Sequence, residues 1–399
     1  MEWKEVTLGD FMQCNPKRAI KKGQKARKIT MDLLIPHSKT IRNWNYEPYN
    51  GGAKFQNGDT IMARITPCLE NGKHAFVSIL DKGEIAYGST EYFVFCGKEE
   101  VSDNDFVYYL TKTPLFRDTA IKSMVGSSGR QRAQMDVLEN LKMLVPKDIS
   151  DQRRIASILS SLDRKIELNN KINADLEEMA QAIFKNWFVD FEPFKDGKFV
   201  DSELGMIPEG WKVGRLTEIA SYMNGLAMQK FPPENDEDSL PVLKIKELGQ
   251  GFCGPDSDRC SCNIKDECKV HNGDVIFSWS GTLLVDVWCG GDCGLNQHLF
   301  KVTSKEYPKW FYYYWTKHHL QEFIHIAKDK AVTMGHIKRG HLEEALVAIP
   351  DNDSMERAHE LFEPILSKMI SLRLENSRLS LLRDTLLPHL MSGELEVPE

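Results

Sequence analysis

The sequence contains no apolar run long enough to cross a membrane, which takes about 18 or more consecutive apolar residues. Its N-terminus, MEWKEVTLGD, also lacks the apolar core of a signal peptide. We therefore expect a soluble, cytoplasmic protein with no membrane contact. Of its 399 residues 41% are hydrophobic, so the chain is long enough to form two or three domains, each with its own core.

Cysteine is scarce, and the nine present are an odd number, which suits a reducing compartment better than a disulfide framework. Four of them gather in the C-terminal half, at Cys253, Cys260, Cys262 and Cys268. Structural zinc sites usually pair their ligands as Cys-x2-4-Cys, which these intervals do not reproduce. The N-terminal half has no counterpart, so we expect reduced free thiols, with zinc as the minor alternative.

Catalytic motifs are missing as well. The sequence contains no Gly-x-x-x-x-Gly-Lys-Ser/Thr phosphate loop, no Gly-x-Gly-x-x-Gly turn, no His-Glu-x-x-His and no Gly-x-Ser-x-Gly. It also lacks the Asn/Asp-Pro-Pro-Tyr/Phe tetrapeptide with which amino-methyltransferases hold the target amine. We therefore expect the chain to catalyse nothing by itself.

An overall basic charge is absent too, since the formal net charge of -7 gives no sign of a nucleic-acid partner. The charge is uneven, however, and Cys14 to Lys28 holds seven Lys/Arg residues and no acidic residue. A basic run is more often a solvated surface than a binding site. On its own this segment is weak evidence for DNA.

The sequence does contain two long heptad patterns. Residues 151–187 have neither Gly nor Pro, and apolar or Asn residues recur every seven positions, which predicts one helix roughly 55 Å long. The last forty residues repeat the spacing, with Leu162 matching Ile365 and Asn173 matching Asn376. We expect these helices to pair as an antiparallel coiled coil. Asn169 and Asn173 either fix its register or lie at the edge of its seam, and we expect the aromatic residues Trp187, Phe188 and Trp315 to be core rather than stacking platforms.

The rest of the chain is an internal repeat. In each half, an Asn-Gly-Asp turn precedes a predicted strand, an aromatic run begins a segment of helical length, and a glycine-bearing basic loop leads to a strand that ends in Pro. We expect five parts: residues 1–150 (first globular unit), 151–190 (first helix), 191–210 (linker), 211–350 (second globular unit) and 351–399 (second helix and tail). The matched segments are 3–10 and 211–218, 57–64 and 272–279, 91–95 and 297–302, 106–110 and 310–315, and 126–146 and 333–350.

Six short segments in this order are specific in combination. They are IELNN at 166–170, FKNWFVDF at 184–191, GDVIFSWSGT at 273–282, LNQHLF at 295–300, TMGHI at 333–337 and LLPHLMSGEL at 386–395. With them the chain resembles the DNA-specificity subunit (HsdS type) of type I restriction-modification systems.

The resemblance implies an α+β fold in which two α/β target recognition domains are separated by two long helices. Each domain would read one half of a bipartite, asymmetric sequence in double-stranded DNA, and two methylation subunits would dock on the helices. S-adenosylmethionine, ATP and Mg would be bound by these partners and by the motor-nuclease restriction subunits, and no cofactor by this chain. The Cys14–Lys28 segment has no equivalent after Trp211, so we expect the two half-sites to differ.

Base contacts are expected from polar and basic residues of the loops, whose types suit the edges of guanine and adenine. These candidates are Arg64, Thr66, Arg130, Gln131 and Arg132 in the first half, and Ser278, Ser280, Thr333, His336, Lys338 and Arg339 in the second. Phosphate contacts, which add affinity without sequence information, are expected from Lys17, Arg18, Lys21, Lys22, Lys25, Arg27 and Lys28.

Three alternatives remain open. One is a coiled-coil scaffold that binds no DNA, against which the basic loops count. Another is an enzyme subunit of a fused restriction-methylation system, against which the missing motifs count. The third is the specificity subunit of another multi-subunit restriction-methylation type.

Overall fold

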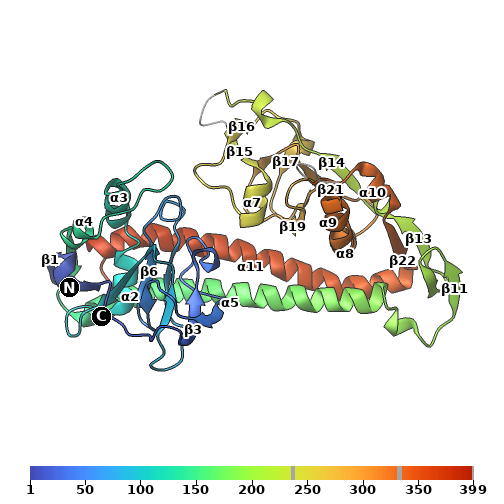
Figure 1. The fold of residues 1–399 in the computed structure, drawn as a ribbon. Coiled ribbons are helices and arrows are strands. Elements are labelled where there is room, and N and C mark those ends of the chain that lie inside the picture. Colours follow the sequence, from blue (N-terminus) through green and yellow to red (C-terminus); the bar gives the residue numbers. More distant parts are fainter. Residues whose placement is uncertain (235–238, 330–334, 398–399) are drawn as a thin grey trace. The chain divides into compact units, whose positions relative to one another are not determined.

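The computed structural model describes residues 1–234, 239–329 and 335–397. It forms two compact units, of which unit 1 is Met1–Leu168 with Arg378–Glu399 and unit 2 is Asn169–Ser377. Two long helices, α5 (Ile149–Phe188) and α11 (Asn352–Ser392), each contribute one part to each unit (Figure 1). The two helices predicted from the heptad pattern are therefore confirmed.

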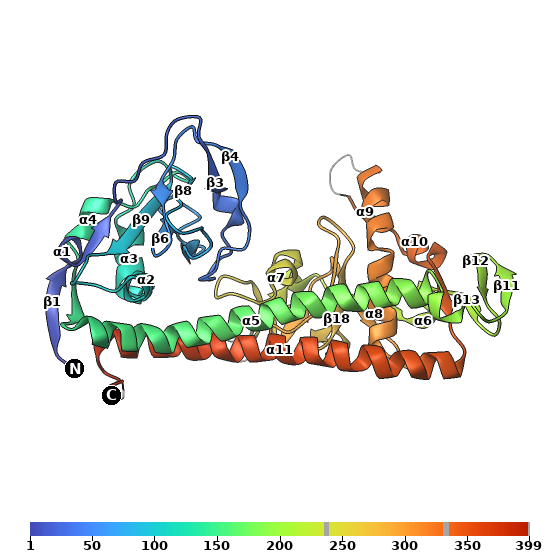
Figure 2. The same ribbon diagram turned by 90° about the horizontal axis from the view of Figure 1, so that it is seen from below.

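Within each unit, α5 and α11 lie side by side and run in opposite directions (Figures 1 and 2). In unit 1, Asp163 of α5 forms an ion pair with Arg383 of α11 at 2.6 Å. In unit 2, the rings of Phe184 and Phe362 lie 6.3 Å apart. Within unit 2, Asn169 contacts Asn376 and Phe184 contacts Phe362, so the residue number on α11 falls as that on α5 rises. The pairing is therefore antiparallel, as expected.

Unit 1 contains two four-stranded sheets, ordered β2-β9-β6-β7 and β4-β3-β8-β5, and a ladder of β1 with β10. All pairs are antiparallel except β3 with β8. The strands are β1 (Trp3–Thr7), β2 (Met12–Cys14), β3 (Lys25–Ile29), β4 (Asn45–Pro48), β5 (Lys54–Phe55), β6 (Thr60–Ala63), β7 (His74–Phe76), β8 (Ala86–Gly88), β9 (Tyr92–Gly97) and β10 (Lys142–Pro146). The short helices are α1 (Leu8–Phe11), η1 (Met31–Leu33), α2 (Asn104–Leu110), α3 (Pro114–Lys122) and α4 (Met135–Glu139).

Unit 2 has the sheets β14-β21-β18-β19 and β16-β15-β20-β17, the ladder β13-β22 and the hairpin β11-β12. Its strands are β11 (Phe199–Ser202), β12 (Gly205–Pro208), β13 (Lys212–Arg215), β14 (Ser221–Asn224), β15 (Ser239–Leu243), β16 (Arg259–Ser261), β17 (Lys269–Val270), β18 (Val275–Ser278), β19 (Leu284–Val287), β20 (Cys293–Leu295), β21 (Leu299–Thr303) and β22 (Leu346–Ile349). Its short helices are η2 (Glu192–Phe194), α6 (Leu216–Ile219), η3 (Met228–Lys230), α7 (Ile245–Gln250), η4 (Asp266–Cys268), α8 (Lys309–His318), α9 (Leu320–Asp329) and α10 (Arg339–Glu344).

The two units share one topology. Strand for strand, β2-β9-β6-β7 corresponds to β14-β21-β18-β19, and β4-β3-β8-β5 to β16-β15-β20-β17. The parallel pair β15 with β20 also occupies the place of β3 with β8. The internal repeat predicted from the sequence is therefore confirmed.

The Asn-Gly-Asp turns form as predicted. Gly58 and Gly273 have φ angles of +90° and +91°, which glycine adopts without a steric penalty. The carboxylate of Asp59 accepts a hydrogen bond from the backbone N–H of Gln56 at 2.8 Å, and Asp274 accepts one from His271 at 2.9 Å. This closes each turn directly before a strand, β6 or β18, whose residues are all buried.

Each unit packs its sheets and short helices against its part of the long helices. In unit 2, Phe188 and Phe362 pack with Trp310 of the aromatic run, and the rings of Trp310 and Phe362 stack at 4.7 Å. Phe188 is 1% and Trp315 3% exposed, while Trp187 packs partly buried beside them. The expectation that these aromatic residues are core is confirmed.

The segment expected to be a linker contains the hairpin β11-β12 and buries Phe191 and Ile207 in the core of unit 2. The turn of this hairpin is residues 203–204, and composition alone did not predict the hairpin. The boundaries of the five parts stay a prediction. No helix in the described part of the chain is long and apolar enough to span a bilayer.

Three of the four clustered cysteines lie in two different hydrophobic clusters of unit 2. Cys260 and Cys268 are buried with Met228, whereas Cys253 packs beside Cys293 and Leu243. All nine cysteines are free thiols. Across residues 1–234, 239–329 and 335–397, no group of three or more His, Cys, Asp or Glu side chains is placed to hold a metal ion.

Candidate nucleic-acid interface

In unit 1, two segments that carry candidate base contacts meet where β6 ends. The backbone N–H of Thr66 donates to the carbonyl of Gln131 at 3.0 Å, and the N–H of Ala133 donates to the carbonyl of Arg64 at 2.8 Å. The glycine-bearing loop is thus hydrogen-bonded alongside the chain that continues β6. The structure therefore brings Arg64 and Thr66 together with Arg130, Gln131 and Arg132.

An acidic residue organises the basic side chains at this place. The carboxylate of Glu91, which precedes β9, accepts hydrogen bonds from Nε of Arg132 at 3.0 Å and from Nη2 at 2.7 Å. These hydrogen bonds are the largest cause of a raised Arg132 pKa. Arg64 approaches the same carboxylate to 3.9 Å, with its guanidinium 5.0 Å from the ring centre of Phe93. Arg130 is exposed, and Thr66 contacts the sulfur of Met124 at 3.3 Å.

Unit 2 has the same backbone arrangement. The N–H of Gly281 donates to the carbonyl of Gly335 at 2.9 Å, and that of Ile337 donates to the carbonyl of Trp279 at 3.0 Å. Ser280 therefore lies opposite His336, and its hydroxyl is 3.1 Å from Nδ1 of His298.

The remaining candidates of unit 2 have different environments. Ser278 is 0% exposed and donates to the carbonyl of Ser280, so its hydroxyl is inside the protein. Lys338 and Arg339 are exposed at the start of α10. Thr333 lies outside the described residues.

The basic segment of unit 1 divides into two groups. Lys17, Lys21, Lys22 and Lys25 are exposed and form no ion pair within the described part of the chain. The other three side chains are bound within the protein. Arg18 holds the buried Asp59 at 2.9 Å, Arg27 pairs with Asp81 at 3.0 Å, and Lys28 pairs with Glu47 at 2.8 Å. As phosphate contacts, all seven remain predictions.

Sequence reasoning missed two kinds of residue here. Glu91 directly precedes β9, and His298 directly precedes the equivalent strand β21. The repeat shows that the two positions match, but their role becomes visible only when the strands pair. Trp44 directly precedes the edge strand β4 and is 42% exposed, and Tyr46 on β4 is 64% exposed. The guanidinium of Arg27 lies 4.8 Å from the ring centre of Trp44. Only the structure shows that these aromatic residues are outside the core.

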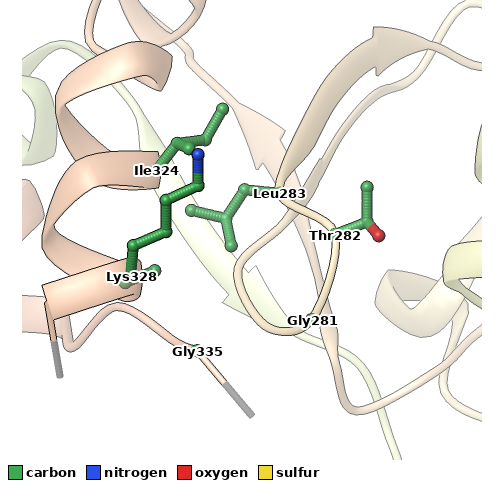
Figure 3. A pocket seen from close by; sticks show the side chains of 7 residues that line it. Gly281, Thr282, Leu283, Ile324, Lys328 and Gly335 are labelled. Carbon is green, nitrogen blue, oxygen red and sulfur yellow. The ribbon is translucent and has the colours of Figure 1, made fainter. Parts of the chain in front are cut away.

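Unit 2 also contains an apolar pocket of about 300 Å³ (Figure 3). Its described lining has one charged side chain, that of Lys328, which borders Ile324 and Leu283. Catalysis needs several convergent polar groups, and this lining offers none of the usual acid–base or nucleophilic pairs. Its described members are Gly281, Thr282, Leu283, Ile324, Ala327, Lys328 and Gly335.

Both units are α/β units in which a glycine-bearing basic loop pairs with the end of an equivalent strand, β6 or β18. The family model of the type I restriction modification DNA specificity domain matches residues 1–178 and 208–373. The chain therefore belongs to this family, as its resemblance predicted.

Individual relatives agree. The chain is 30% identical over 312 residues to the type I restriction enzyme MjaIX specificity subunit of Methanocaldococcus jannaschii, covering 74% of this chain and 70% of that one. It is 22% identical to the HindI specificity subunit of Haemophilus influenzae over 99% of this chain and 100% of that one. The S subunit of a type I restriction-modification system from M. genitalium shares the fold, with a TM-score of 0.50, 15% identity, and coverage of 98% of this chain and 96% of that one.

Proposed function

We propose that this chain is the sequence-specific DNA-binding subunit of a type I restriction-modification complex. The observation that carries the proposal is the repeated arrangement in which a glycine-bearing loop pairs with the end of the same strand in both units. Arg132 in unit 1 and His336 in unit 2 occupy equivalent positions in these loops, and both are residue types suited to contacts with base edges.

A bipartite and asymmetric target follows from the differences between the units. Unit 1 carries Arg132 and the four exposed lysines, whereas unit 2 carries His336 at the place of Arg132 and has no such lysine segment. Equivalent backbones with different side chains recognise different sequences. We therefore expect two unlike half-sites, each read by one unit.

The partners follow from the same assignment. The chain would act as a non-catalytic subunit on whose long helices two methylation subunits dock, with motor-nuclease subunits joining them. These partners would carry S-adenosylmethionine, ATP and Mg. The overall charge of -7 suits a subunit that binds DNA weakly alone and specifically in the complex.

The test is to co-express the chain with its methylation subunits and map methylated adenine across the host genome. We expect one bipartite motif with a fixed spacer. Replacing Arg130 and Arg132 together by Ala should relax one half-site and leave the other intact. Methylation without a common sequence motif would contradict the proposed function. A double variant that leaves both half-sites unchanged would contradict the assignment of the loop.

A further inference from the structure

The two units place three side chains at equivalent positions. The N–H of Arg64 donates to the carbonyl of Glu91 at 2.9 Å, and the N–H of Trp279 donates to the carbonyl of His298 at 3.4 Å. At the third position, the backbone of Arg132 forms a β-bridge with Ile65 in unit 1. In unit 2, the backbone of His336 forms the equivalent bridge with Ser280. Arg64, Glu91 and Arg132 in unit 1 therefore correspond to Trp279, His298 and His336 in unit 2.

The hydrogen bonds of Arg132 leave a defined pair of donors. A guanidinium has five N–H groups. Glu91 accepts from Nε and from one N–H of Nη2, and the carbonyl of Arg130 accepts one N–H of Nη1 at 3.2 Å. One N–H on each terminal nitrogen remains without a partner within the described part of the chain. Donors on the two terminal nitrogens of an arginine are the groups that bind O6 and N7 on the major-groove edge of guanine.

The ion pair itself adds little to the stability of the fold. The side chain of Glu91 is 23% and that of Arg132 40% exposed, and ion pairs near the surface usually contribute little to folding. What the bidentate contact does supply is a fixed orientation, because a planar guanidinium held along one edge cannot rotate about its last side-chain bonds.

We propose that Glu91 is a positioning residue that orients Arg132 for bidentate donation to a guanine in the half-site of unit 1. This rests on the proposed function. In unit 2, the equivalent positions carry an indole and two imidazoles, with His298 held by the hydroxyl of Ser280. No guanidinium occupies them, so unit 2 recognises its half-site by different chemistry at this position.

The test uses the complex of the full chain with its methylation subunits and measures base preference at every target position by binding-site selection. Arg132→Lys keeps the charge but loses the fork, so we expect the preference for guanine at one position to fall by roughly 5- to 150-fold. Glu91→Gln should relax the same position. The double variant should be no less selective than Arg132→Lys alone, because Glu91 acts through Arg132.

Glu5→Gln is the matched control, since Glu5 forms a surface ion pair with Lys142 at 3.1 Å in the same unit. It should leave all preferences unchanged, and the urea midpoint of each variant separates loss of specificity from loss of folding. The inference is overturned if Glu91→Gln leaves the preference unchanged, or if Arg132→Lys weakens binding equally for all sequences, as a phosphate contact would. A wild-type complex without any sequence preference would instead contradict the proposed function.

Discussion

The side-chain amide of Asn169 on α5 donates to Oδ1 of Asn376 on α11 at 2.9 Å within the helix pair of unit 2. It also donates to the carboxylate of Glu375 at 2.8 Å, and Asn376 donates to Asn170 at 3.0 Å. Asn169 is 0% exposed. A buried polar contact of this kind stabilises one register of two paired helices, because sliding the helices would separate its partners.

Replacing only one of the two asparagines should lower the free energy of unfolding more than replacing both. We expect Asn169→Leu alone to lower the free energy of unfolding by about 1 to 3 kcal/mol, because polar groups on α11 lose a buried partner. The double variant with Asn376→Leu should recover most of that loss. Urea unfolding of the single and double variants measures the coupling, and additive effects would show that the two amides act independently.

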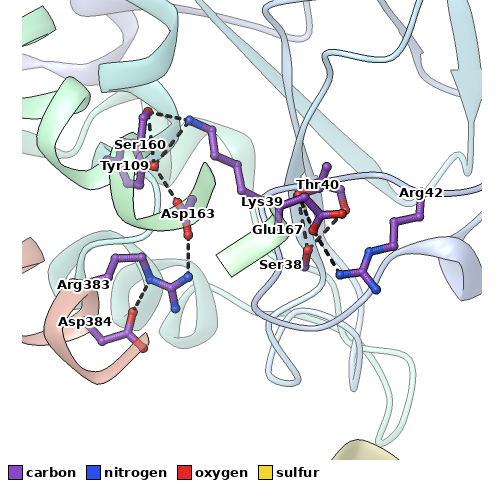
Figure 4. A network of polar contacts seen from close by, with 10 residues as sticks. All are labelled: Ser38, Lys39, Thr40, Arg42, Tyr109, Ser160, Asp163, Glu167, Arg383 and Asp384. Atoms are coloured by element: carbon purple, nitrogen blue, oxygen red, sulfur yellow. Dashed lines mark hydrogen bonds and ion pairs between the residues drawn. The ribbon is translucent and has the colours of Figure 1, made fainter. Parts of the chain in front are cut away.

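A buried ion pair joins the same two helices in unit 1 (Figure 4). Asp163 and Arg383 are 7% and 6% exposed in their side chains, and Tyr109 donates its hydroxyl to Asp163 at 2.5 Å. Asp163→Asn keeps the shape and removes the charge, which leaves the Arg383 guanidinium poorly compensated. We expect a loss of up to about 3 kcal/mol of unfolding free energy, since Asp384 still pairs with Arg383 at 2.8 Å.

The control for this prediction is Glu192→Gln, which removes an exposed pair with Lys195 at 2.5 Å. Exposed pairs contribute about 0 to 1 kcal/mol, so this variant should unfold almost like the wild type. Equal urea midpoints for the two variants would mean that the buried pair does not hold the helices together.

The Asn169–Asn376 contact and the Asp163–Arg383 ion pair differ in how far the sequence could predict them. The seven-residue period predicted the helices and placed Asn169 on their seam, because helix geometry converts spacing directly into a face. Asp163 and Arg383 are ordinary charged residues in that pattern, and only the antiparallel pairing reveals that they meet. The repeat likewise predicted the strands of both units. The role of Glu91 depends on a strand register that no local pattern records.

The basic segment shows the opposite limit. Nothing in the sequence distinguished its seven basic residues from one another. In the structure, however, Arg18 forms an ion pair with the buried Asp59, whereas Lys17 and Lys21 are exposed to solvent. The difference arises from tertiary contacts between residues that are far apart in the chain. Charge counting can therefore locate a basic segment, but it cannot separate the side chains available to a ligand from those that hold the fold.

Acid should destabilise unit 1 through His74. This residue is 7% exposed, stacks on Tyr108 at 4.7 Å, and its Nε2 lies 2.9 Å from the hydroxyl of Thr111. Burial lowers the pKa of His74 well below its usual value of 6.5, and the nearby Lys112 and Arg117 add to this effect. Because the unfolded chain takes up a proton near pH 6.5 and the folded chain does not, stability is full above that pH and falls below it.

The slope from one histidine is at most about 1.4 kcal/mol per pH unit. We expect wild-type protein to lose about 1 kcal/mol more than His74→Phe between pH 7.5 and pH 5.5, since that variant keeps the stacking and removes the titrating group. Urea unfolding, together with hydrogen exchange of β7, measures this. A variant as acid-sensitive as the wild type would assign the effect to other groups.

The four exposed lysines should add affinity without specificity. Replacing Lys17, Lys21, Lys22 and Lys25 by Ala should reduce the slope of log K against log salt by about 0.9 for each phosphate contact that is lost. Base preference in both half-sites should stay the same. Replacing Lys142 and Lys147, which pair with Glu5 and Glu2, is the control, and an equal change in slope there would show a general charge effect.

The long helices raise a further question, which is whether they set the spacer between the half-sites. Adding one heptad to each helix, after Asn170 and after Arg373, keeps the seam in register and lengthens the pair by about 10 Å. The insertions leave Asn169 opposite Asn376, and Arg373 with its partner Asp286 at 2.7 Å. Along B-DNA the added length corresponds to roughly three base pairs.

The rotations match less well than the lengths. Three base pairs turn the duplex by roughly 100°, whereas a heptad of left-handed supercoil turns the helix ends by only about 25°. If the helices are the ruler, the insertion variant should select a longer spacer between unchanged half-sites and bind it more weakly, because DNA twist must absorb the difference. Binding-site selection with a randomised spacer measures both effects. Retention of the original spacer at undiminished affinity would show that the spacing is set elsewhere in the complex.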